Sequence, residues 1–80
     1  MTKGISYIKY EPHKNCNDVI RFAEQDFAEE NLTCDEEEFT EMFLYIRMQG
    51  DNHKTIVIID SGDTLVKSPN GYTILNAKEN

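Results

Sequence analysis

The fold depends on one stretch, Met42-Phe43-Leu44-Tyr45-Ile46-Arg47-Met48, which is apolar nearly all round. Periodicity alone cannot assign so short an apolar run to a helix or to a strand. The glutamate-rich segment before it favours a helix, because Thr33 with Glu36 fits a capping box, as does Asp35 with Glu38. We therefore predict a helix through this stretch.

This predicted helix starts within Cys34–Glu36 and ends at Gly50, a residue that commonly follows the last helical turn. Its buried stripe would consist of Phe39, Met42, Phe43 and Ile46. The alternative is a strand over Met42–Met48. In that case Gly50-Asp51-Asn52 would be a hairpin turn, and the strand would pair with Thr55–Asp60.

The remainder of the C-terminal half reads as strands. Thr55–Asp60 is a continuous β-branched run, which indicates a buried or central strand. Two further strands are expected at Thr64–Lys67 and Tyr72–Leu75. Ser68-Pro69-Asn70-Gly71 lies between them and is a hairpin signal, because Asn-Gly tolerates positive φ. We predict a three-stranded antiparallel meander.

The N-terminal part predicts a strand followed by a helix. Ile5–Tyr10 alternates and is rich in strand formers, and Pro12 ends it. A helix is expected over Asn17–Asn31, capped by Asn15 or Asn17. The predicted fold class is therefore α+β, a single domain over residues 1–80. Its order is an N-terminal strand, two helices packed on one face of the sheet, and the C-terminal meander.

Negative charge is concentrated in one segment, Asp18–Glu41. This segment holds ten carboxylates and one base, Arg21, so it carries −9, whereas the whole chain carries −7. Ion pairs within a helix cannot neutralise so many acids, and like charges four residues apart repel. We interpret the segment as a surface that docks on a basic partner. The candidate partner-binding residues are Glu24, Asp26, Glu29, Glu30, Asp35, Glu36, Glu37, Glu38 and Glu41.

Four apolar side chains project off the predicted helical stripes and could anchor such a contact: Phe22, Leu44, Tyr45 and Met48. The preferred function is a small acidic inhibitor that occupies a basic groove of a nucleic-acid-handling protein, with its carboxylates in place of phosphates. Direct binding of nucleic acid or of an anionic membrane is not expected at this net charge. The binding-class alternative is a host regulatory or adaptor module that acts as a homodimer.

In size and charge alone, the chain is similar to the small acidic inhibitors of phages and other mobile elements, including nucleic-acid mimics and anti-CRISPR proteins. The resemblance carries no residue over, because it rests on no motif. No catalytic or cofactor motif withstands inspection of the sequence, so we predict that the protein is not an enzyme and needs no cofactor.

The segment Ile56–Ser68 resembles the first motif of the haloacid dehalogenase phosphatases, an apolar strand followed by Asp-x-Asp-Gly-Thr-Leu. The resemblance implies a nucleophile at Asp60. However, Gly62 stands where the second aspartate belongs, and Asp63 is one residue out of register. We interpret the segment as a strand that leads into a turn, and a hydrolase using Asp60 and Asp63 is an alternative.

The cysteines and histidines offer one further alternative, a metal site. His13, Cys16, Cys34 and His53 form a two-Cys, two-His set, but only His13 and Cys16 have ligand-like spacing. We predict no metal and two reduced thiols. With no apolar leader or membrane-length run in the sequence, the expected localisation is cytoplasmic.

Overall fold

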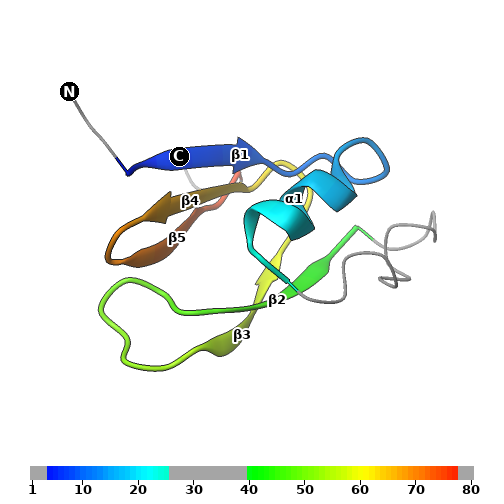
Figure 1. Ribbon diagram of the computed structural model, residues 1–80. Coiled ribbons are helices and arrows are strands. Elements are labelled where there is room, and N and C mark those ends of the chain that lie inside the picture. The colour runs from blue at the N-terminus through cyan, green and yellow to red at the C-terminus, as the bar shows by residue number, and fades with distance from the viewer. Residues whose placement is uncertain (1–3, 26–39, 78–80) are drawn as a thin grey trace.

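The computed structural model describes residues 4–25 and 40–77 of the 80-residue chain. These residues form one helix and five strands (Figure 1). In chain order the elements are β1 (Ser6–Lys9), α1 (Cys16–Phe22), β2 (Met42–Ile46), β3 (Thr55–Ile59), β4 (Thr64–Ser68) and β5 (Gly71–Leu75). The predicted mixture of α and β structure is confirmed, and the predicted order of elements is wrong.

The decisive stretch is a strand. In β2, Met42, Leu44 and Ile46 are buried, whereas Phe43 and Tyr45 between them are exposed. This strict alternation is the period of a strand with one face in the core. The helix predicted through Met42–Met48 is therefore wrong, and the alternative strand is correct. The predicted start of that helix, Cys34–Glu36, lies outside the described residues.

β2 pairs with β3 in antiparallel register, with Met42 opposite Ile59 and Ile46 opposite Thr55. The predicted meander of the last three strands is therefore wrong, because β3 pairs with β2 and not with β4. The predicted hairpin is correct: β4 and β5 pair around Ser68 and Gly71. β1 joins them antiparallel, which gives a sheet of order β1-β4-β5.

The helix α1 is shorter than predicted. It ends at Phe22, because Ala23 is its C-cap and Glu24 has a left-handed φ of 57°. Residues 26–31 of the predicted helix lie outside the described residues. The predicted side-chain cap is also absent. Asn15 occupies the N-cap position, but its side chain accepts a hydrogen bond from the Glu11 amide (2.8 Å) and donates one to the Lys9 carbonyl (2.6 Å). It fastens the β1–α1 connection instead.

The two sheets meet where the chain beyond β2 runs parallel to the start of β5. The Tyr72 amide donates to the Arg47 carbonyl, and the Gln49 amide donates to the Tyr72 carbonyl, both at 2.9 Å. Met48 and Tyr72 thereby form an isolated parallel bridge. The two backbones lie so close together here that Gly71 has no room for a side chain. This junction brings together the end of β2, the end of β4 and the start of β5, and they line one pocket with the end of α1.

One hydrophobic core lies between α1 and the inner faces of both sheets. It consists of Tyr10, Cys16, Val19, Ile20, Ala23, Met42, Leu44, Ile46, Ile59 and Leu65. Cys16 is disulfide-bonded, so the predicted reduced thiol at this position is wrong. Cys34, the only other cysteine of the sequence, lies outside the described residues. In the described part of the chain, no helix has the length and apolarity needed to span a membrane.

Candidate functional site

Two of the nine predicted partner-binding carboxylates lie within the described residues. Glu24 follows the end of α1, and Glu41 precedes β2; both are exposed. Seven lie outside the described residues: Asp26, Glu29, Glu30, Asp35, Glu36, Glu37 and Glu38. Glu24 and Glu41 thus mark the two places where the acidic segment joins the described fold.

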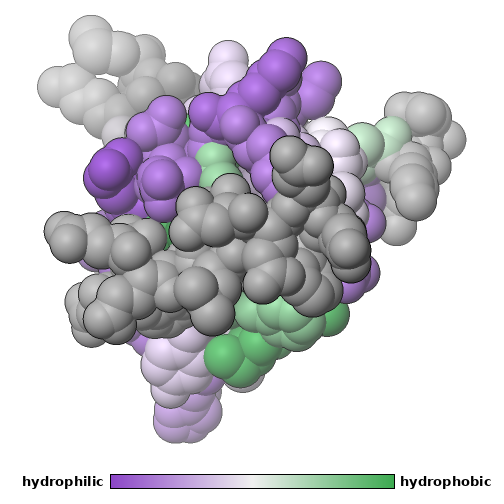
Figure 2. Space-filling model, turned by 90° about the vertical axis from the view of Figure 1, so that its right-hand side faces the viewer, coloured by the Kyte–Doolittle hydropathy of each residue, from purple (hydrophilic) through white to green (hydrophobic). Residues whose placement is uncertain are grey.

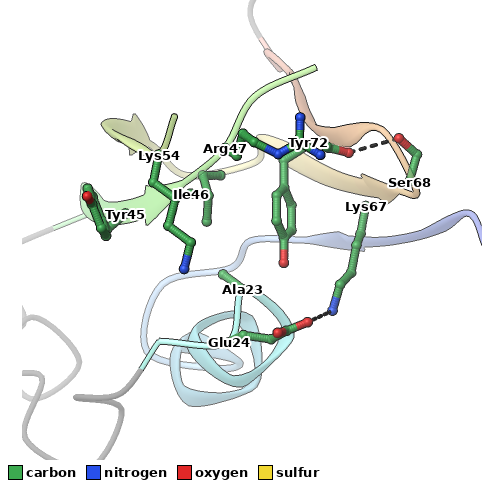
Figure 3. Close-up of a pocket in the computed structure, with 10 residues that line it drawn as sticks. Ala23, Glu24, Tyr45, Ile46, Arg47, Lys54, Lys67, Ser68 and Tyr72 are labelled. Carbon is green, nitrogen blue, oxygen red and sulfur yellow. Dashed lines mark hydrogen bonds and ion pairs between the residues drawn. The ribbon is translucent and has the colours of Figure 1, made fainter. Parts of the chain in front are cut away.

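Glu24 sits at the mouth of an open pocket of about 200 Å³ (Figure 3). Its walls come from the end of α1, from β2 with the residues that follow it, and from the β4–β5 hairpin. The lining residues are Ala23, Glu24, Tyr45, Ile46, Arg47, Lys54, Lys67, Ser68, Gly71 and Tyr72. Three of these residues are cationic, although the protein as a whole is strongly acidic. The pocket is therefore a local concentration of positive charge.

The cation best placed in this pocket is Lys67 of β4. Its ammonium group forms an ion pair with the Glu24 carboxylate (Figure 3). It also donates to the Phe22 carbonyl at 3.3 Å. It also lies over the rings of Phe22 (5.6 Å) and Tyr72 (5.9 Å). The hydrogen bond from Lys67 and its charge hold the pKa of Glu24 below its usual value, and the same hydrogen bond raises the pKa of Lys67.

The other two cations are also engaged within the chain. Arg47 donates to the Asp51 carbonyl at 3.0 Å, and Lys54 lies 5.8 Å from the centroid of the Tyr45 ring. Tyr72 donates weakly to the Phe22 carbonyl (3.4 Å), and burial raises the pKa of its hydroxyl. The pocket therefore contains Glu24 as the counter-anion of Lys67. This ion pair holds the end of α1 to β4.

The next residue along the chain clamps α1 to the other sheet. The Gln25 side-chain amide bonds both backbone groups of Tyr45: its nitrogen donates to the Tyr45 carbonyl (3.1 Å), and its oxygen accepts from the Tyr45 amide (3.0 Å). The Gln25 side chain thus makes, at this edge of β2, the pair of backbone hydrogen bonds that a neighbouring strand would make. Together, Glu24 and Gln25 attach the end of the helix to both sheets.

An apolar surface covers the outward face of the β2–β3 ribbon. Phe43 (52% exposed) lies opposite Ile58 (49%), and Tyr45 (49%) lies opposite Ile56 (62%). We call these four side chains the ribbon face. In Figure 2 hydrophobic side chains gather at the lower part of the molecule, at the height where Figure 1 places β2 and β3. Large apolar side chains exposed together in this way are typical of a contact surface.

The sequence prediction identified one of the four ribbon-face residues as an anchor, Tyr45. The other proposed anchors are not exposed: Leu44 is buried, and Phe22 and Met48 are partly buried against the core. Phe43 was missed because the helical reading placed it in the buried stripe. Reading Met42–Ile46 with a period of two would have separated its buried residues from its exposed ones.

Asp60 and Asp63 lie in the turn between β3 and β4, where both side chains accept backbone hydrogen bonds. Asp63 is 6% exposed, and its carboxylate accepts hydrogen bonds from the Asp60 amide (2.9 Å), the Ala77 amide (3.0 Å) and the Asn76 side chain (3.3 Å). Asp60 accepts a bond from the Ser61 amide at 2.6 Å. With three donors already on it, the Asp63 carboxylate holds the β3–β4 turn and the chain after β5 together.

The proposed metal ligands do not assemble in the described residues. No group of three or more His, Cys, Asp or Glu side chains there could hold a metal ion. The sulfur of Cys16 is part of a disulfide, so it is not available as a thiolate ligand. Disulfides are rare in cytosolic proteins, so the one at Cys16 does not favour the predicted cytoplasmic localisation, which stays a prediction.

Comparison with known proteins gives no relative. No protein-family model, no curated protein sequence and no solved structure matches this chain.

Proposed function

We propose that this protein acts by binding another protein that presents a basic surface, and that its acidic segment, Asp18–Glu41, makes the contact. The observation that carries the proposal is the charge distribution. Ten carboxylates and one base lie in 24 consecutive positions, and the rest of the chain carries a small positive charge. Charge separated in this way steers association with a partner of opposite charge.

The ion pairs of the described residues support this proposal. Arg21, the single base of the segment, pairs with Asp18 at 3.2 Å on the exposed surface of α1. It is therefore committed to one carboxylate, and Lys67 from outside the segment is committed to Glu24. The segment holds ten acids and the whole chain only eight Lys and Arg residues, so part of the negative charge of the segment needs solvent, counterions or a partner.

The kind of partner we propose is a nucleic-acid-handling protein, inhibited through its nucleic-acid-binding groove. Such a groove is lined by Arg and Lys and is built for closely spaced phosphate charges. A dense run of carboxylates can occupy it and release the same counterions. The interaction would weaken steeply with salt, as binding of the nucleic acid does.

The test compares two variants with the same net charge. In the first, Glu36→Gln, Glu37→Gln and Glu38→Gln neutralise three acids inside the segment. In the matched control, Glu11→Gln, Asp51→Asn and Glu79→Gln neutralise three acids outside it. Each variant and the native chain are immobilised, exposed to lysate at low salt, and eluted with a salt gradient in the presence and absence of DNA.

The proposal predicts that basic nucleic-acid-binding proteins are retained by the native chain and by the control, and are released by DNA. The variant inside the segment should release the same proteins at clearly lower salt. Equal elution from the two variants would show that total charge alone matters, and it would refute a binding role of the segment. Retention that ignores both salt and DNA would refute the choice of partner.

A further inference from the structure

The outer edge of β3 carries a set of backbone groups that point away from β2. Tyr45 directs its amide and carbonyl to Gln25, on the side of β2 away from β3. Tyr45 and Ile56 are therefore a non-hydrogen-bonded pair of the antiparallel ladder, and so are Phe43 and Ile58 two residues along. It follows that Ile56 and Ile58 present their amides and carbonyls at the outer edge of β3.

Within the described residues, no strand pairs with this outer edge. β3 also lacks the protection that edge strands usually have: all five of its residues, Thr55–Ile59, are β-branched and none is charged. β1, which is likewise an edge strand, is one residue shorter and carries Lys9. An exposed lysine is a common device against strand addition. The edge of β5 is already bonded at Tyr72 by the backbone of Arg47 and Gln49, and the outer edge of β2 is bonded at Tyr45 by Gln25, so β3 is the edge best suited to accept another strand.

We propose that two copies of this chain pair through the outer edges of β3, antiparallel, about a two-fold axis at Val57. In this register Ile56 of each copy lies opposite Ile58 of the other, so the outward backbone groups of both residues meet their partners. The two β2–β3 ribbons become one four-stranded sheet. This inference does not rest on the proposed function, because it concerns only contacts between copies of this chain.

The side chains agree with this register. Across the four strands, each ribbon-face row would run Phe43, Ile58, then Ile56 and Tyr45 of the second copy, so the central isoleucines pair directly across the new interface. The charges that flank β3 also agree. The register places Lys54 of each copy opposite Asp60 of the other, so opposite charges face each other at both ends of the interface. The reverse, parallel arrangement would place like charges side by side.

The dimer is tested on the purified chain alone, by sedimentation velocity from low micromolar to several hundred micromolar protein. The expected species has twice the monomer mass of 9.3 kDa and persists in high salt, since backbone hydrogen bonds and isoleucine contacts hold it. Ile58→Pro removes one outward amide and leaves the ladder to β2 in place, so this variant should remain folded and become monomeric. Ile56→Lys should have the same effect through charge at the edge.

Tyr7→Ser is the matched control, because it removes an exposed aromatic side chain from β1, an edge strand of the other sheet. It should dimerise as the native chain does. Circular dichroism of each variant verifies the fold, and Ile56→Lys decides if Ile58→Pro does not fold. The proposal is overturned by a native chain that stays monomeric throughout, by assembly that grows beyond the dimer, or by folded edge variants that dimerise normally.

Discussion

Replacement of Gly71 by alanine tests the junction on which the fold and the pocket depend. Gly71 has a φ of 128°, and a Cβ added to it would lie 2.9 Å from the Arg47 carbonyl oxygen, the Met48 carbonyl carbon and the Gln49 amide nitrogen. All three are backbone atoms. They belong to the segment that also exchanges hydrogen bonds with Tyr72, so they cannot move aside without loss of those bonds.

Gly50 provides the matched control, because it has a φ of 90° but nothing within 4 Å of an added Cβ. Gly50→Ala should therefore show the conformational cost alone, about 1–2 kcal/mol for a side chain in the left-handed region. Gly71→Ala should add an overlap cost of about 1–3 kcal/mol. A chain of this length has a total stability of roughly 4–12 kcal/mol at about 0.05–0.15 kcal/mol per residue. The loss at Gly71 would thus be a large share of the total.

The assay is urea unfolding, followed by circular dichroism and by the fluorescence of the four tyrosines, since the chain has no tryptophan. With an m-value of about 1 kcal/mol/M, the midpoint should fall by about 1–2 M for Gly50→Ala and by about 2–5 M for Gly71→Ala. Equal shifts for the two variants would refute the reasoning, because they would mean that the backbone of residues 47–49 is not packed closely against Gly71.

Three further predictions concern single contacts. Asp63→Ala should lower the free energy of unfolding by roughly 2–4 kcal/mol, because it leaves the amides it binds without their charged acceptor, and Asp63→Asn should lower it less; urea titration of both variants checks this ranking. Burial raises the pKa of Tyr10, so its contribution is fully present below its ordinary value of about 10 and is lost as the pH rises through the folded value; Tyr10→Phe should therefore weaken the alkaline loss of stability, and an unchanged profile would contradict this. The pKa of Glu24 is lowered by Lys67, so the ion pair stabilises the fold above the ordinary pKa of Glu24 and the contribution disappears as the pH falls through the folded value; thermal melts should separate Glu24→Gln from the native chain at neutral pH and not in acid.

The parts of the fold that local residues specify could be predicted from the sequence. Gly71 marks the β4–β5 hairpin because it has a φ of 128°, which few other residues adopt, and the β-branched run at β3 has little alternative to a strand. The Met42–Ile46 segment is different. Its residues fit either state locally, and pairing with β3 decides the outcome by burying every second side chain. Pairing between segments is a long-range effect that a capping pattern cannot report.

The end of α1 shows the same limit of local reasoning. Nothing in the sequence near Glu24 breaks a helix, since the next glycine is Gly50. The helix stops at Phe22 because the next residues have better partners elsewhere: Glu24 reaches Lys67, and Gln25 reaches the backbone of Tyr45. These partners lie twenty or more residues away in the sequence. A residue that looked like part of a helical acidic face is, in the described fold, a clamp between elements.

The two proposed interaction surfaces differ in how visible they are in the sequence. The acidic segment is a matter of composition, so it can be recognised without any knowledge of register. The outer edge of β3 can be recognised only after two structural facts are known: β2 is a strand, and the Tyr45 backbone faces Gln25. Those facts place the amides of Ile56 and Ile58 outward, where a second copy could bind them. The two surfaces are also separable by experiment, because salt should weaken the contact made by the carboxylates and should leave the paired β3 strands in place.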